Sequence, residues 1–138
     1  MVCLNACKKK EEPAPVPRAQ LLAGTSSKTW KITAATTTGQ PAANFLLSFD
    51  ECQKDNLFIL HTDKKLVLDE GATKCNSSNP QTISTGTWSL SADEKKITLS
   101  TSGSIVNGDV NITELSNTTL KGTFTYLGTP VNVTFTAQ

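Results

Sequence analysis

Hydrophobic and polar residues alternate in short runs along the chain from residue 29 onward, and turn-forming residues separate the runs. The last run shows this most clearly, because Val131, Val133 and Phe135 alternate with polar neighbours. A period of two is typical of a β-strand with one buried face. Threonine is abundant and no long window is dominated by helix-forming residues, which also favours strands.

These runs predict about eight strands, at residues 29–37, 56–61, 65–69, 84–91, 96–100, 105–115, 120–127 and 131–135. Most are joined by tight turns, so we predict an all-β antiparallel meander. Closure of such a meander into a barrel leaves no exposed strand edge. A sandwich of two sheets also fits the spacing and stays open at this point.

Two segments do not read as regular strands. Residues 19–23 precede Gly24 and predict a short helical turn. Residues 42–51 fit either a strand or an irregular lid, which would hold Phe45, Leu46 and Phe49.

Size and charge exclude several classes of protein. A chain of 138 residues suits one domain, which buries roughly two-thirds of its unfolded surface. The net charge of +1 is small and the basic residues of the domain are dispersed, so no nucleic-acid partner is expected. No apolar run reaches 18 residues, so no membrane-spanning helix is predicted.

The sequence LNAC at residues 4–7 has the form of a lipobox, in which Cys7 becomes the lipidated first residue of a bacterial lipoprotein. Residues 1–6 would then be the remnant of a signal peptide. Residues 7–20 would form the lipidated cysteine and a charged, proline-rich linker, and residues 21–138 the folded domain. A disordered tail that carries a cytosolic cysteine is the alternative.

Several motifs of the domain occur in a characteristic order. They are LLAG at 21–24, Cys52, DEGATKC at 69–75, GTWSLS at 86–91 and ITELSNTTLKGTFTY at 112–126. In these motifs the chain resembles the lipocalin-like domain of small Bacteroidota lipoproteins, over residues 21–138. The resemblance implies an eight-stranded barrel, and ligand carriage only by analogy of fold.

The lipobox and this resemblance together predict an envelope protein of a Gram-negative bacterium. Its partner would be the outer membrane, through a lipid anchor on Cys7. The charged residues 10–12 resemble a signal for export to the cell surface, and whether the domain faces the periplasm or the surface stays open.

Cysteine counting predicts a disulfide. With Cys7 lipidated and Cys3 in the signal peptide, Cys52 and Cys75 are the pair left in the domain. In an oxidising envelope they should form a bond, which closes a loop of 23 positions and stabilises the fold by about 3 kcal/mol. A metal site needs more ligands than these two cysteines.

No catalytic residue, cofactor or metal is expected. His61 is the only histidine and lies at a strand end, and no nucleophile-elbow motif surrounds any serine. Acidic pairs such as Asp69–Glu70 fit solvated turns better than calcium sites.

We therefore predict a non-enzymatic domain that binds a small apolar or amphipathic molecule at the barrel mouth. The candidate ligand-binding residues are aromatic or lie on the strand NLFILH, whose two faces are both apolar: Phe58, Leu60, Trp88 and Tyr126. The alternative is a structural or interaction subunit of an envelope complex, with a packed barrel and no small ligand, because eight strands lie at the crossover between a filled and a hollow interior.

Overall fold

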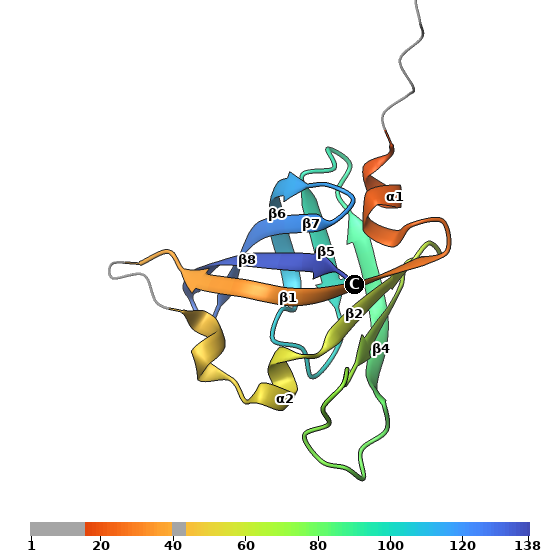
Figure 1. Cartoon of the computed structure of the whole chain (residues 1–138). Coiled ribbons are helices and arrows are strands. Elements are labelled where there is room, and N and C mark those ends of the chain that lie inside the picture. The colour runs from red at the N-terminus through yellow and green to blue at the C-terminus, as the bar shows by residue number, and fades with distance from the viewer. Residues whose placement is uncertain (1–15, 40–43) are drawn as a thin grey trace, which may run out of the picture.

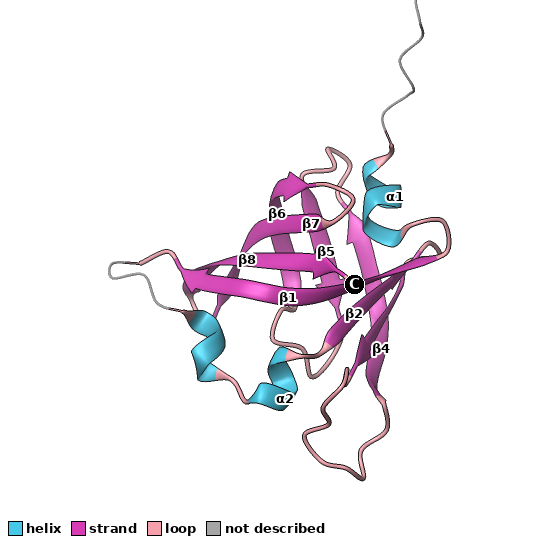
Figure 2. Cartoon of the chain, viewed as in Figure 1, coloured by secondary structure: helices cyan, strands magenta, loops and turns pink. Residues whose placement is uncertain are grey.

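The computed structural model describes residues 16–39 and 44–138, and β-strands dominate them (Figure 2). Two α-helices and one 3-10 helix occur in these residues: α1 (Arg18–Ala23), η2 (Phe45–Ser48) and α2 (Glu51–Lys54). The strands of the same residues are β1 (Ser27–Thr37), β2 (Leu57–His61), β3 (Lys65–Asp69), β4 (Thr82–Leu90), β5 (Lys96–Ser100), β6 (Gly108–Leu115), β7 (Thr119–Tyr126) and β8 (Thr129–Ala137). Cys7 and most of the predicted linker lie outside the described residues.

Within this described part, the strands form one closed antiparallel barrel in sequence order, and β1 pairs with β8 to complete the ring (Figure 1). The predicted meander and its closure are confirmed, and the two-sheet sandwich is wrong. Strand β1 pairs with two neighbours: residues 27–31 pair with β2, and residues 30–37 pair with β8. A bulge between Ile32 and Ala34 shifts the register of the second pairing, and Ala35 becomes the next buried position. Bulges bend a strand, which lets β1 curve from one neighbour to the other.

Large side chains fill the interior of the barrel. Trp30, Phe58, Trp88 and Phe135 are each at most 2% exposed, and the rings of Phe58 and Phe135 pack edge to face at 5.4 Å. Strands β4 and β5 approach closely at Gly86, where a Cβ atom would lie 1.9 Å from the carbonyl oxygen of Ser100. A residue without a side chain is therefore needed at this point of the wall.

The two ends of the barrel are covered by different segments (Figure 1). Helix α1 lies over the end where β1 begins, with Leu22 and Ala23 buried, and it confirms the predicted helical turn before Gly24. Residues 44–54 cover the opposite end through η2 and α2. Phe45 packs edge to face against Tyr126 at 5.0 Å and Phe124 at 6.1 Å. Of the two readings of residues 42–51, the irregular lid is correct for the residues that are described.

One predicted strand begins later than its sequence suggests. Residues 105–107 belong to the loop before β6, and β6 itself begins at Gly108, whose φ is 97°. Val106 is nevertheless fully buried. Its backbone exchanges hydrogen bonds with the Ser104 hydroxyl, which donates to the Val106 carbonyl at 2.5 Å and accepts from the Val106 N–H at 3.1 Å. Burial favours an apolar residue in a loop as much as in a strand. The sequence pattern therefore does not distinguish a buried loop residue such as Val106 from a strand residue.

The predicted disulfide is present between Cys52 of α2 and Cys75 of the β3–β4 loop, with Cα atoms 5.0 Å apart. The same two segments are joined by a hydrogen bond that the backbone N–H of Thr73 donates to the carboxylate of Asp55 at 2.7 Å. The lid is thus attached covalently to a loop of the barrel rim, outside the core.

Replacement of both cysteines by serine should lower the free energy of unfolding by about 3 kcal/mol, because the unfolded chain regains the entropy of an open loop. Urea denaturation followed by circular dichroism measures this. Dithiothreitol should shift the unfolding midpoint of the parent protein by a similar amount and leave the double variant unchanged. If the double variant unfolded at the same urea concentration as the parent protein, the disulfide would not stabilise the fold.

Candidate ligand-binding groove

The described residues of the barrel interior leave little room for a ligand beneath the lid. The space beneath the lid is lined by Ile32, Leu46, Phe58, Leu68 and Ile105 among others, and has a volume of about 10 Å³. That is about the size of one water molecule, whereas small-molecule sites have volumes on the order of 300–1,000 Å³. A bound molecule therefore has to sit elsewhere or displace the lid.

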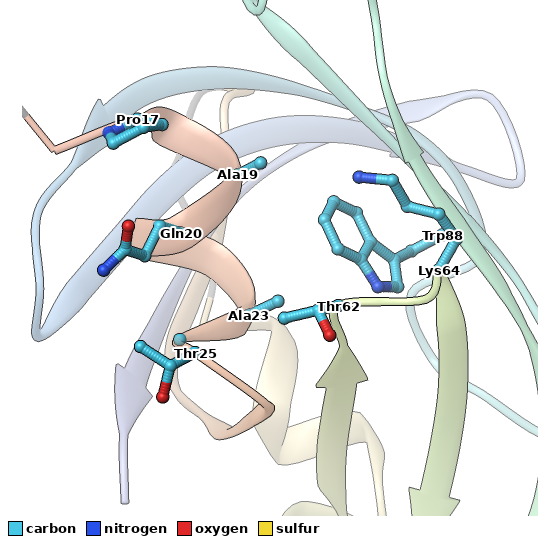
Figure 3. A pocket seen from close by; sticks show the side chains of 9 residues that line it. Pro17, Ala19, Gln20, Ala23, Thr25, Thr62, Lys64 and Trp88 are labelled. Carbon is cyan, nitrogen blue, oxygen red and sulfur yellow. The ribbon is translucent and has the colours of Figure 1, made fainter.

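A groove of about 370 Å³ lies at the end of the barrel that α1 covers, between α1 and the turn that joins β2 to β3. The described residues that line it are Pro17, Ala19, Gln20, Ala23, Gly24, Thr25, Thr62, Lys64 and Trp88. Figure 3 shows Ala19 and Ala23 pointing from the helix toward the indole of Trp88. The groove is thus a cleft with one helical wall and one wall from the barrel.

Two side chains of β1 hold the helical wall in place. The indole N–H of Trp30 donates a hydrogen bond to the carbonyl oxygen of Leu22 at 2.8 Å. The ammonium of Lys28 donates to the carbonyl oxygen of Leu21 at 3.0 Å, and partial burial lowers the pKa of Lys28. Gly24, whose φ is 65°, ends the helix and turns the chain into β1. The last turn of α1 is therefore fixed by bonds to its otherwise unpaired carbonyl groups.

The barrel wall of the groove is built on Trp88, whose indole N–H donates to the carbonyl oxygen of His61 at 2.8 Å. The ammonium of Lys64 lies over the ring, 4.0 Å from its centroid, in a cation–π contact. Trp88 is only 2% exposed, because Lys64 covers one face of a ring that otherwise belongs to the core. Lys64 itself has a φ of 75°, a left-handed conformation that favours glycine or asparagine.

The structure does not place the four sequence-predicted ligand residues around one groove or cavity, although Phe58, Leu60 and Trp88 share the hydrophobic core and Tyr126 packs against it. Trp88 lines the groove, whereas Phe58 lines the small space beneath the lid. Leu60 is buried in the core at 2% exposure. Tyr126 packs against Phe45 and Phe49 of the lid, with ring centroids at 5.0 and 6.0 Å. That these residues contact a ligand stays a prediction for each of them.

Sequence reasoning missed the residues that complete the groove, above all Lys64, Ala19 and Ala23. One signal was available for Lys64. Lys64 is the last residue of the three-residue turn 62–64 between β2 and β3. In hairpin turns of this length the last residue often has a left-handed backbone, which favours glycine. No comparable signal marks the two alanines, since their role depends on where α1 docks.

The remaining candidate chemistry is sparse. His61 lies at the end of β2 and contributes its backbone carbonyl to Trp88. Among residues 16–39 and 44–138, no group of three or more His, Cys, Asp or Glu side chains could hold a metal ion. In the same residues, no helix has the length and apolar character needed to cross a membrane.

Comparison with known proteins assigns the family. The model of the lipocalin-like domain matches residues 27–122, from the beginning of β1 into β7. The chain therefore belongs to the lipocalin-like domain family, whose members are generally non-enzymatic. No curated protein matches the chain significantly. The family match covers the barrel wall of the groove but not α1.

Replacement of Lys64 by glycine should uncover Trp88 without unfolding the protein. The substitution removes left-handed strain of about 1 kcal/mol and a cation–π contact of about 0.5–1 kcal/mol, so the free energy of unfolding should change by less than about 1 kcal/mol. Acrylamide quenching of tryptophan fluorescence should increase. Glu94→Gly is the matched control, because Glu94 is also left-handed, with a φ of 59°, but does not line the groove. Equal quenching in both variants would refute the covering role of Lys64.

Proposed function

We propose that this protein is a non-enzymatic binding module that holds a small amphipathic molecule in the groove between α1 and Trp88. The observation that carries the proposal is the lining of this groove of about 370 Å³, where Pro17, Ala19 and Ala23 face Trp88. Two larger surface hollows, of about 590 and 460 Å³, are lined mainly by polar residues, and the space beneath the lid has only about 10 Å³. A volume of about 300 Å³ or more is typical of small-molecule sites.

The composition of the groove supports an amphipathic ligand. Pro17 and Ala19 supply accessible apolar surface beside the buried Ala23 and Trp88. The polar groups of the lining come from Gln20, Thr25, Thr62 and Lys64. A predominantly apolar lining with a small number of polar groups is the usual character of small-molecule sites. The groove also lies at one mouth of the barrel, where α1 covers the end at which β1 begins.

We further propose that the protein is an envelope lipoprotein, anchored to the outer membrane through Cys7. Cys7 lies outside the described residues, and the support is the LNAC sequence at residues 4–7. Pro17 follows Cys7 by ten positions, and a chain of that length spans at most about 35 Å. Because Pro17 lines the groove, a lipidated Cys7 would keep the groove near the membrane, which is a reservoir of amphipathic molecules.

A second candidate function is that of an interaction subunit with a packed barrel. A filled interior supports it, as do two large apolar side chains near the opposite end of the barrel. Leu47 of η2 is 75% exposed and Leu127 of the β7–β8 turn is 89% exposed. The two candidates differ in which end of the barrel makes the functional contact.

The groove can be tested by native mass spectrometry of the full chain, recovered gently from its own membranes and compared with its denatured mass. A non-covalent ligand should be present in the parent protein. Ala19→Leu adds a branched apolar side chain to the helical wall of the groove, where it should clash with a bound ligand. Ligand occupancy should fall at least about fivefold, which corresponds to a steric cost of about 1 kcal/mol.

The control is Leu127→Ser, which alters the opposite end of the barrel and should leave ligand occupancy unchanged. If Leu127→Ser instead abolishes co-purification of a protein partner while no ligand is found, the interaction-subunit function replaces the binding module. If Ala19→Leu retains full ligand occupancy, the ligand does not occupy the groove.

The anchor is tested independently through Cys7. Intact mass spectrometry of the membrane-extracted protein should show an acyl addition on Cys7, and Cys7→Ser should move the protein from the membrane fraction to the soluble fraction. Cys52→Ser serves as the control, because it removes a cysteine without affecting the lipobox. A protein without acyl mass at Cys7 would refute the anchor and leave the groove proposal standing.

A further inference from the structure

We infer that the groove selects amphipathic molecules with a single anionic group, which pairs with Lys64 while the apolar body lies against Trp88 and α1. This inference rests on the proposed function, since it names the class of ligand for the same groove. It depends on three properties of Lys64: its charge, its backbone conformation and its contact with Trp88.

The charge in the groove is unbalanced. Of the described residues that line it, Lys64 is the only charged one, and the polar side chains beside it are the neutral Gln20, Thr25 and Thr62. Ion pairs in the described part of the chain involve other lysines: Lys54 with Glu51, Lys96 with Asp109, and Lys121 with Glu114. No described carboxylate lies within ion-pair distance of Lys64, so an anionic ligand would be its first counter-charge.

The backbone of Lys64 is held in a conformation that a lysine does not favour. Its φ of 75° lies in the left-handed region, which favours glycine. The lysine side chain runs across the indole of Trp88 at the edge of the groove (Figure 3). Glu94 adopts the same left-handed conformation in the β4–β5 turn, so the conformation belongs to the hairpin turn, and its consequence at Lys64 is a side chain that crosses the indole.

The contact between Lys64 and Trp88 couples binding of the anionic group of a ligand to binding of its apolar body. While the ammonium rests 4.0 Å above the ring, one face of the indole is closed to any apolar group. An anion that draws the ammonium away uncovers this face and replaces the lost cation–π contact by an ion pair of similar strength. An uncharged ligand has to displace Lys64 without that compensation, and a cationic ligand is repelled by it.

The test compares decyl amphiphiles that differ in charge, each below its micellar concentration: decanoate, decyltrimethylammonium and uncharged decyl maltoside. Isothermal titration of the full chain measures the affinities, and the indole N–H resonance of Trp88 reports the place of binding. We expect decanoate to bind about three- to tenfold more tightly than decyl maltoside, and decyltrimethylammonium to bind most weakly.

Two neighbouring lysines provide a matched pair of variants. Lys64→Gln should abolish the preference, so that decanoate and decyl maltoside bind equally, with decyl maltoside binding no more weakly than it does to the parent protein. Lys65→Gln removes the same charge from the next position, which does not line the groove, and should keep the preference for decanoate. A preference that survives Lys64→Gln, or that is lost equally in both variants, would overturn the inference.

A free carboxylate amphiphile and an acidic phospholipid both carry an anionic group on an apolar body. Vesicle binding distinguishes these two sources of the anion. Association that depends on Lys64 with phosphatidylglycerol vesicles, but not with phosphatidylcholine vesicles, would assign the anion to a lipid headgroup; dependence seen with decanoate alone would assign it to a free amphiphile. Equal binding of all three amphiphiles that is lost in Ala19→Leu would refute anion selection and retain the groove. Binding of none of them, with no ligand in the native protein, would refute the proposed function itself.

Discussion

The pairing of β1 with β8 is the constraint on which the rest of the structure depends. It turns an open meander into a closed barrel and so satisfies the hydrogen-bonding groups of both edge strands. Closure also sets the interior diameter, which for eight strands is just wide enough to be filled by side chains. Here two tryptophans and two phenylalanines fill it, as Trp30, Phe58, Trp88 and Phe135 are almost fully buried.

The two ends of the barrel are built differently. The lid of residues 44–54 is packed by aromatic contacts and clamped by the Cys52–Cys75 disulfide. Helix α1 is held by hydrogen bonds from Trp30 and Lys28 to its last turn, and a groove remains beside it. The groove therefore lies beside the segment that polar contacts hold in place, whereas the lid leaves about 10 Å³ beneath it.

The candidate site was accessible to sequence reasoning only in part. Trp88 could be singled out because a tryptophan in an alternating strand either packs in the core or contacts a ligand. In this structure it packs in the core, and Lys64 covers one face of its ring. Lys64, Ala19 and Ala23 are separated from each other along the chain by up to 45 positions. Only the docking of α1 against the β2–β3 turn brings them to one groove, and no local pattern encodes that docking.

The sequence by itself determined the class of fold, the order of most strands and the disulfide, because each of these follows from local alternation, turn residues or the number of cysteines. The tertiary structure decided the bulge at Ile32–Ala34, the lid conformation of residues 44–54 and the burial of Val106 in a loop. It also decided that the barrel is filled. The physical reason is that strand alternation records only which face of a strand is buried. Whether side chains from opposite strands fill the interior depends on side-chain size and on the register and curvature of all strands together.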